Sequence, residues 1–405
     1  MKYTIVVLLS FLIFPVLGSG WIQMADFGGI ARHRSTGLSI GNKAYMGLGH
    51  YNGGGTNILF DDWWEYDPAT GAWTQKADYQ GGPCYHAAGF TVDNIGYVGT
   101  GRISASGSIL VQDFFQYNPL TNSWSQIASF PGDARRGAIS FVINNEGYVG
   151  TGQTDFGNTA TFYKYSPTFN FWTQIPSLPG GARTSSVAFA IGNNGYVGTG
   201  QTDFGSTNDF WQYTPSTNNW TAKANVGPTN RQEAAGFSLN GLGYIGTGDD
   251  FSSGNNFKDM WEYQPSTDTW IQIENFQGTA RRYLVAFTHG NYGYAGIGTN
   301  GTNFKDFWKF DQTLSILERN MSIVELSLYP NPTSDVLNLK LELPESIEQA
   351  KLELKIYNTK GMLSHSSIMK NGDNEVNLNK LSTGTYYASL NYDNVVLKTE
   401  KLILR

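Results

Sequence analysis

Arginine recurs at one position of a long repeat, and it is the residue with the clearest chemical meaning in this chain. The positions lie about fifty residues apart, and arginine fills five of the six. They are Arg32, Cys84, Arg135, Arg183, Arg231 and Arg281. Since a guanidinium group binds a carboxylate through two parallel hydrogen bonds, a ring of these side chains would suit a carboxylate or an acidic peptide. The simpler alternative, favoured for any one arginine, is a hydrogen bond from one repeat to backbone carbonyls of the next.

Arg34, Arg136 and Arg282 lie beside this series but do not follow its period. A structural side chain would recur in every repeat, so these three are better candidates for a function that only some repeats perform. They also add positive charge where an anionic ligand could bind. We therefore predict that they contribute to ligand binding.

Acidic side chains recur as well, and we interpret most of them as structural. Asp155 and Asp203 occupy matched Gln-Thr-Asp-Phe-Gly segments, and Asp250 lies in a related one. Calcium sites need a denser set of carboxylates, so turn formation is the better explanation, and Asp155 and Asp203 are kept as candidate ligand contacts. Another aspartate precedes the third apolar run of each repeat, with threonine in the third repeat. These residues are Asp62, Asp113, Thr161, Asp209, Asp259 and Asp306.

Residues for metal or nucleophilic catalysis form no recognisable motif. The five histidines show no metal-ligand spacing, no nucleophile elbow occurs, and His86 alone is kept as a candidate ligand contact. A Gly-x-Gly-x-x-Gly match at 296–301 leads into an expected strand rather than a helix, so it is not a dinucleotide site. Cys84 is expected to be a small buried side chain. We therefore expect no metal and no cofactor.

The elements that position these side chains follow from the repeat. Tryptophans at the ends of successive repeats lie 48 to 52 residues apart. They are Trp21, Trp73, Trp124, Trp172, Trp220 and Trp270. Each repeat contains four short apolar or aromatic runs separated by turn residues, as in 185–191, 195–200, 209–215 and 220–224. Four strands in each of six repeats, without helical periodicity, predict an all-β, six-bladed β-propeller.

Five repeats carry a Gly-Tyr-x-Gly-x-Gly run, which the first repeat varies as AYMGLG. The first five repeats also have a Tyr-x-Pro turn before a tryptophan, as in WEYDPATGAW and WQYTPSTNNW. This pattern resembles the kelch family over residues 21 to about 311, with Gly-x-Gly in place of the usual glycine pair. The last repeat lacks its tryptophan ending, which residues 20–26 supply, so the N-terminal strand should close the ring on the last blade. A copper site resembling that of galactose oxidase would need Cys84, His86 and His50, and is the weaker alternative.

The two ends of the chain indicate export. Residues 1–20 combine Lys2, an apolar stretch and small residues, which is typical of a signal peptide. The stretch is shorter than the roughly 20 residues of a transmembrane helix, so we expect no span in the mature chain. After residue 311 the composition changes, which indicates a linker over 312–325 and a small immunoglobulin-like β-sandwich over 326–405.

Three features mark this second domain: Tyr329-Pro330-Asn331-Pro332 at its start, LSTGTY at 381–386, and a basic, apolar end over 398–405. Together they resemble the C-terminal sorting domain of the type IX secretion system of Bacteroidetes. The resemblance implies recognition by the secretion machinery and a location at the cell surface or outside the cell. A generic immunoglobulin-like spacer or a carbohydrate-binding module is the alternative.

Long, variable loops on one face of the propeller are the expected binding region. We predict a non-catalytic module that binds a glycan or a protein there, and the net charge of -6 argues against nucleic acid. The alternative is a sugar-modifying enzyme resembling the kelch-type sialic acid mutarotases. That resemblance implies arginines on the sugar carboxylate, with Arg231 as an electrostatic clamp and Glu233 as a general acid or base.

Overall fold

The computed structural model describes residues 20–104, 107, 109–315, 327–341, 352–392 and 395–405. The chain divides into two compact units, of which one spans Trp21–Gln312 and the other contains Thr313–Arg405. The expected signal peptide, apart from residue 20, and most of the expected linker lie outside the described residues. Within the described parts, no helix is long and apolar enough to cross a membrane.

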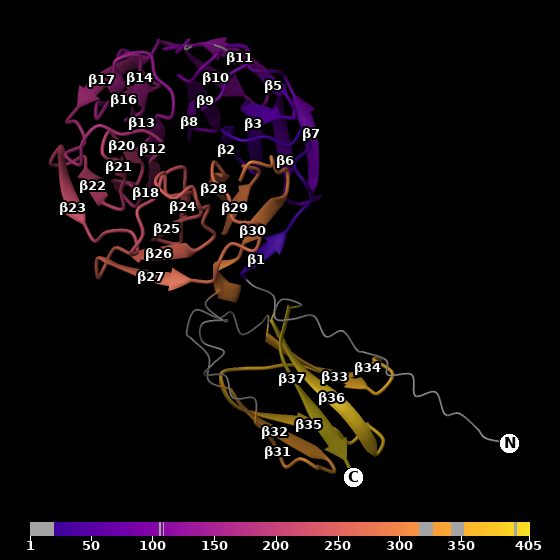
Figure 1. The fold of residues 1–405 in the computed structure, drawn as a ribbon. Coiled ribbons are helices and arrows are strands. Elements are labelled where there is room, and N and C mark those ends of the chain that lie inside the picture. Colours follow the sequence, from indigo (N-terminus) through magenta and orange to yellow (C-terminus); the bar gives the residue numbers. More distant parts are fainter. Residues whose placement is uncertain (1–19, 105–106, 108, 316–326, 342–351, 393–394) are drawn as a thin grey trace. The chain divides into compact units, whose positions relative to one another are not determined.

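The first unit consists of six four-stranded antiparallel sheets arranged as the blades of a propeller (Figure 1). Blade 1 contains β2 (Thr36–Ile40), β3 (Lys43–Gly47), β6 (Trp63–Asp67) and β7 (Ala72–Lys76). Blade 2 contains β8 (Ala88–Val92), β9 (Ile95–Gly99), β10 (Phe114–Asn118) and β11 (Ser123–Gln126). Blade 3 contains β12 (Ile139–Ile143), β13 (Glu146–Gly150), β16 (Phe162–Ser166) and β17 (Phe171–Ile175). In each blade the first strand is innermost, since these strands neighbour one another around the axis.

The other three blades repeat this order. Blade 4 contains β18 (Val187–Ile191), β19 (Asn194–Gly198), β22 (Phe210–Thr214) and β23 (Asn219–Lys223). Blade 5 contains β24 (Ala235–Leu239), β25 (Leu242–Gly246), β26 (Met260–Gln264) and β27 (Thr269–Ile273). Blade 6 contains β28 (Val285–His289), β29 (Tyr292–Gly296), β30 (Phe307–Phe310) and β1 (Trp21–Gln23). Small hairpins extend the loops between second and third strands of three blades: β4 (His50–Gly53) with β5 (Thr56–Leu59), β14 (Gln153–Thr154) with β15 (Gly157–Asn158), and β20 (Gln201–Thr202) with β21 (Gly205–Ser206).

The N-terminal strand closes the ring, as the sequence predicts. β1 pairs antiparallel with β30, with Trp21 opposite Phe310. The Trp21 side chain is 4% exposed and packs against the rings of Phe276 and Phe310 at centroid distances of 5.1 and 5.0 Å. The first and last parts of the propeller sequence therefore share one blade, and β30 has a partner on its outer side, as the third strand of every other blade has.

Buried apolar clusters lie between neighbouring blades rather than within them. One cluster joins Phe90 and Tyr97 of blade 2 to Phe130 and Trp172 of blade 3. The repeat tryptophans also bridge blades, because the Trp172 indole donates to the Ala128 carbonyl at 2.9 Å in the segment that follows blade 2. Each blade thus depends on its neighbour for most of its apolar burial.

The second unit forms two antiparallel sheets. The first contains β31 (Ser327–Tyr329), β32 (Val336–Leu341) and β35 (Gly372–Asn377). The second contains β33 (Leu352–Asn358), β34 (Leu363–Ile368), β36 (Gly384–Tyr392) and β37 (Val395–Leu404). Alternate residues are fully buried in both sheets, as at Leu337 and Leu339 of β32 and at Leu352 and Leu354 of β33. This alternation confirms the expected small immunoglobulin-like sandwich.

Replacing Trp21 should test how far stability depends on ring closure. We expect Trp21→Ala to lower the free energy of unfolding of the propeller by about 3–5 kcal/mol, because a buried aromatic side chain is lost from the closing strand. Urea unfolding followed by tryptophan fluorescence measures this change. Phe169→Ala, at a side chain that is 80% exposed, is the control and should stay close to the parent protein. Equal effects of both substitutions would contradict the closure argument.

Candidate functional site

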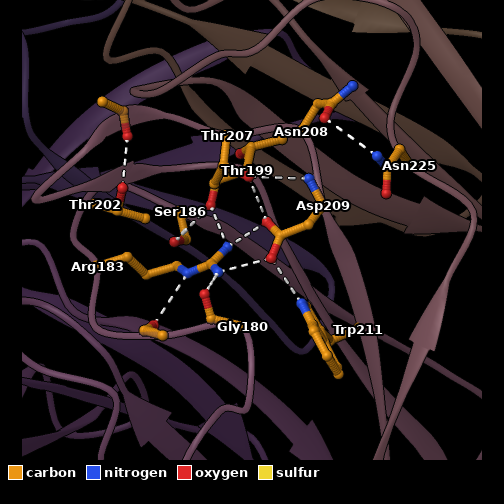
Figure 2. Close-up of polar contacts among 12 residues, drawn as sticks. Gly180, Arg183, Ser186, Thr199, Thr202, Thr207, Asn208, Asp209, Trp211 and Asn225 are labelled. Atoms are coloured by element: carbon orange, nitrogen blue, oxygen red, sulfur yellow. Dashed lines mark hydrogen bonds and ion pairs between the residues drawn. The ribbon is translucent and has the colours of Figure 1, made fainter.

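The repeat arginines are buried inside single blades (Figure 2). The Arg183 side chain is inaccessible to solvent, and two of its guanidinium nitrogens donate to the Asp209 carboxylate at 2.5 and 2.7 Å. It also donates to the Thr199 carbonyl at 3.1 Å. Although burial acts in the opposite direction, the hydrogen bonds and charge of Arg183 hold the pKa of Asp209 below its usual value. Arg32, Arg231 and Arg281 are paired in the same way with Asp62, Asp259 and Asp306.

The ring of ligand-binding guanidinium groups suggested by the sequence is therefore not formed by Arg32, Arg135, Arg183, Arg231 and Arg281. All five are at most 1% exposed. These arginines are structural, as the simpler alternative expects, but their side chains join segments of one blade instead of linking neighbouring blades. This correction also removes Arg231 as a clamp for a sugar carboxylate, since its guanidinium group already binds Asp259.

Blades 2 and 3 depart from this arrangement. Thr161 replaces the aspartate in blade 3, so Arg135 donates to a hydroxyl at 3.0 Å, and burial lowers the pKa of Arg135 to about 10. In blade 2, burial raises the pKa of the Cys84 thiol to about 12. That thiol stays protonated at neutral pH, which suits a packing role and gives no support to the copper alternative. Across the described part of the chain, no three His, Cys, Asp or Glu side chains are grouped closely enough to hold a metal ion.

Six residues, one from each blade, surround the mouth of the central channel. Each lies two positions after the repeat arginine or cysteine, just before the innermost strand, and has a left-handed backbone with φ between 56° and 62°. They are Arg34, His86, Gly137, Ser185, Glu233 and Tyr283. All six line one cavity of about 140 Å³, and a second cavity of about 230 Å³ continues between the innermost strands. We call these six residues the mouth ring.

Backbone hydrogen bonds connect the mouth ring from blade to blade. The N–H groups of five of its residues each donate to the carbonyl of the preceding member, at distances of 2.9 to 3.3 Å. The donors are His86, Gly137, Ser185, Glu233 and Tyr283. The backbone of these residues thus forms hydrogen bonds between blades, and their side chains line the cavity. Because the residue type differs in every blade, this position gives the cavity a chemically varied lining.

Arg34, Tyr283 and Glu233 form a hydrogen-bonded chain across the mouth. The Arg34 guanidinium donates to the Tyr283 hydroxyl at 2.6 Å and lies over its ring at 4.2 Å. The Tyr283 hydroxyl donates in turn to Glu233. Burial raises the pKa of Glu233 from 4.5 to about 7, and the nearby carboxylate of Asp249 acts in the same direction. A carboxyl group with this pKa can accept or release a proton near neutral pH.

Arg282 lies at the same side of the mouth as Glu233. Its guanidinium forms ion pairs with Asp249 at 2.6 Å and with Glu233 at 3.3 Å. Arg136, in contrast, donates to the Gln153 side chain at 2.6 and 3.0 Å in blade 3. The structure therefore brings Arg34 and Arg282 together around Glu233 and places Arg136 on another part of the rim.

Histidines occupy the blade 1 and blade 2 side of the mouth in uncharged form. Burial, helped by the charge of Arg34, lowers the pKa of His33 to about 3 and also lowers the pKa of His86. The His86 ring lies 5.1 Å from the Tyr283 ring, and its Nδ1 atom has no hydrogen-bond partner. This nitrogen is buried from solvent, although His86 is one of the residues that line the cavity.

The two candidate aspartates lie away from the mouth ring, at the tips of hairpins on the long-loop face. Asp155 lies between β14 and β15, and Asp203 lies between β20 and β21. Both are exposed, and the Asp203 carboxylate accepts a hydrogen bond from the Asn158 amide at 2.9 Å. They are rim residues rather than part of the cavity.

Ser185 and Tyr283 were not identified from the sequence, and Glu233 was identified with the wrong arginine. The available signal was variation at a fixed place in the repeat. The position two residues after the repeat arginine differs in every blade, whereas the flanking landmarks stay the same. Variation at one position of an otherwise constant repeat indicates that the fold does not require a particular side chain there.

The comparisons with known proteins agree with this architecture. Residues 21–312 form a kelch-like β-propeller, and they resemble the solved structure entitled "Structure of YjhT" with a TM-score of 0.59 at 18% identity, covering 71% of this chain and 95% of that one. Residues 327–405 match the family described as secretion system C-terminal sorting domain. The C-terminal unit is therefore a sorting domain, and the protein is exported by type IX secretion to the cell surface or the outside.

Curated relatives match a shorter part of the chain. The N-acetylneuraminate epimerase 2 of Escherichia coli is 32% identical over 118 residues, which is 28% of this chain and 30% of the relative. The N-acetylneuraminate epimerase of Shigella flexneri matches with the same identity and coverage. The match thus spans less than a third of the length of these relatives.

Removing the charge of Glu233 should change how stability depends on pH. Because its folded-state pKa is raised to about 7, Glu233 makes a contribution that lowers stability as the pH rises from about 4.5 to 7. Over this range its carboxyl group ionises in the unfolded chain but stays protonated in the folded protein. We expect Glu233→Gln to raise the urea midpoint at pH 8 and to change it little at pH 4. Glu146→Gln, beside Lys164 on the outer part of blade 3, is the control and should show no such gain at pH 8. A lower midpoint for Glu233→Gln at pH 8 would contradict the assignment.

Proposed function

We propose that this protein is an exported propeller that binds a carboxylated sugar at the mouth of its central channel. The observation that carries the proposal is the convergence of Arg34, His86, Glu233 and Tyr283 on one cavity. Arg34 supplies positive charge for a carboxylate, and the other groups supply hydrogen bonds for hydroxyls. Together they fit a ligand that carries one acidic group and several hydroxyl groups.

The size and polarity of the cavity favour a sugar over a protein segment. The two connected cavities, of about 140 and 230 Å³, are lined mainly by small side chains such as Ser35, Ser186 and Ala234 below the mouth ring. Space of this size suits a monosaccharide unit. The N-acetylneuraminate epimerases among the relatives act, by their names, on a carboxylated sugar, which supports this ligand class.

Binding of free N-acetylneuraminate should depend on Arg34. We expect Arg34→Ala to weaken binding about ten-fold or more in isothermal titration calorimetry, because a buried charge-assisted contact to the carboxylate is lost. Lys258→Ala, at an exposed lysine of blade 5, is the control for loss of one positive charge and should leave the affinity unchanged. N-acetylglucosamine, which lacks the carboxylate, should bind weakly to all three proteins. Equal affinities for the two sugars would contradict the proposal.

A second candidate function is epimerisation of the bound sugar at its anomeric carbon. It is favoured by one observation, the pKa of about 7 for Glu233 next to the Tyr283 hydroxyl. In this reaction the Glu233 carboxylate accepts the proton of the anomeric hydroxyl. The ring oxygen takes a proton from Tyr283 as the ring C–O bond breaks, and the open ketone recloses on its other face with both protons returned.

The rate of this reaction should rise with pH. Glu233 acts as a base only when ionised, so the rate should increase through about pH 7 and then level off. Glu233→Gln should reduce the rate by about 100-fold or more. Proton NMR of freshly dissolved N-acetylneuraminate measures the exchange of its anomers against buffer alone. A variant that binds the sugar but matches the parent rate would exclude catalysis by Glu233 and leave binding as the function.

A further inference from the structure

Two matched hairpins present fully exposed phenylalanines on the long-loop face. Phe156, between β14 and β15, is 91% exposed, and Phe204, between β20 and β21, is 102% exposed. They belong to blades 3 and 4, which are neighbours in the ring (Figure 1). A third exposed phenylalanine, Phe251 at 63%, lies in the corresponding loop of blade 5.

The hairpins do not need these aromatic rings for their own structure. In blade 3, the Thr154 hydroxyl donates to the Gly157 carbonyl at 2.9 Å and accepts from the Phe156 N–H at 3.1 Å. In blade 4, the corresponding bonds of Thr202 have the same lengths. Backbone and threonine atoms therefore fix the turn, and the phenylalanine side chains are exposed to solvent at the tips of well-defined hairpins. Phenylalanine side chains exposed in this way at two equivalent places are available for contact with a ligand.

Hydrogen bonds also hold the hairpins next to each other. The Asn158 amide of blade 3 donates to the Asp203 carboxylate of blade 4 at 2.9 Å. The Phe251 N–H of blade 5 donates to the Ser206 hydroxyl at 3.3 Å. The three loops thus form a continuous rim, so the phenylalanines belong to one surface rather than to separate loops.

The side chains of the mouth ring are smallest on the side of these two hairpins. Its members in blades 3 and 4 are Gly137 and Ser185, the two smallest of the six. From there, Arg136 pairs with Gln153, the first residue of β14, and Thr184 pairs with Gln201, the first residue of β20. Both hairpins are therefore paired directly with the residues that precede Gly137 and Ser185.

We propose that Phe156 and Phe204 stack against the neutral sugars that follow the acidic sugar, so that the ligand is the end of an oligosaccharide. This inference rests on the proposed binding function. When Arg34 binds the terminal sugar, the rest of the oligosaccharide extends from the mouth across Gly137 and Ser185. On that side the phenylalanine rings offer flat apolar faces.

The charge of the rim decides between neutral and acidic neighbours. An aspartate precedes each exposed phenylalanine, at Asp155, Asp203 and Asp250. A polymer with a carboxylate on every sugar would meet these negative charges, whereas a neutral sugar would meet hydrogen-bond acceptors. The ligand class is therefore a single acidic sugar linked to neutral sugars.

Calorimetry with the full chain tests the inference, using free N-acetylneuraminate and the trisaccharide sialyllactose as probes. The parent protein should bind the trisaccharide about ten-fold more tightly than the free sugar, because the stacked rings bury additional apolar area. Phe156→Ala with Phe204→Ala should remove this gain and leave the affinity for the free sugar unchanged. Phe169→Ala, at an exposed phenylalanine in the turn between β16 and β17 on the opposite face, is the matched control and should retain the gain.

The outcomes separate this inference from the proposed function. Equal affinity of the parent protein for both probes, or a gain that survives in the double variant, would overturn the role of the phenylalanines while leaving the mouth site in place. Absence of binding by either probe would instead overturn the proposed function itself. Stronger binding of the trisaccharide that depends on both phenylalanines supports the inference.

Discussion

A closed ring of six backbone hydrogen bonds holds the blades together, and the rest of the propeller depends on it. The glycine that ends the six-residue run in each blade (Gly-Tyr-x-Gly-x-Gly, or AYMGLG in blade 1) donates its N–H to the carbonyl of the repeat arginine, or cysteine, in the next blade, at 2.7 to 2.9 Å. The last bond joins Gly298 of blade 6 to Arg32 of blade 1. Gly298 has a φ of 99°, a backbone conformation that favours glycine. The buried guanidinium group then fixes the loop that offers the accepting carbonyl.

The same ring of hydrogen bonds explains the positions of the mouth ring residues. Two residues after the accepting carbonyl, the chain turns through a left-handed residue before entering the innermost strand, and its side chain faces the channel. Glycine would satisfy this turn at little cost, as Gly137 does in blade 3. Non-glycine residues there cost of order 1 kcal/mol each. Arg34, Glu233 and Tyr283 take this conformation nonetheless, and all three line the cavity.

The sequence allowed the fold to be predicted almost completely, because the landmarks that define it are local and repeated. The arginines show where this reasoning stops. Whether Arg183 is free or occupied depends on Asp209, which lies 26 residues later and becomes its partner only when the third strand of the blade forms. Likewise, Arg34 and Arg136 look alike as extra charges, yet they occupy successive positions of the repeat and so face different surroundings. A shift of one residue decides whether a side chain enters the mouth or joins the rim.

The binding features are confined to the propeller unit. The mouth ring, the second cavity and the phenylalanine hairpins all lie within Trp21–Gln312. The export signal and the proposed binding site therefore lie in separate parts of the chain. Since six blades close on themselves through β1, the site does not require the C-terminal domain for its shape. Loss of that domain after export would remove the secretion signal and leave the geometry of the mouth intact.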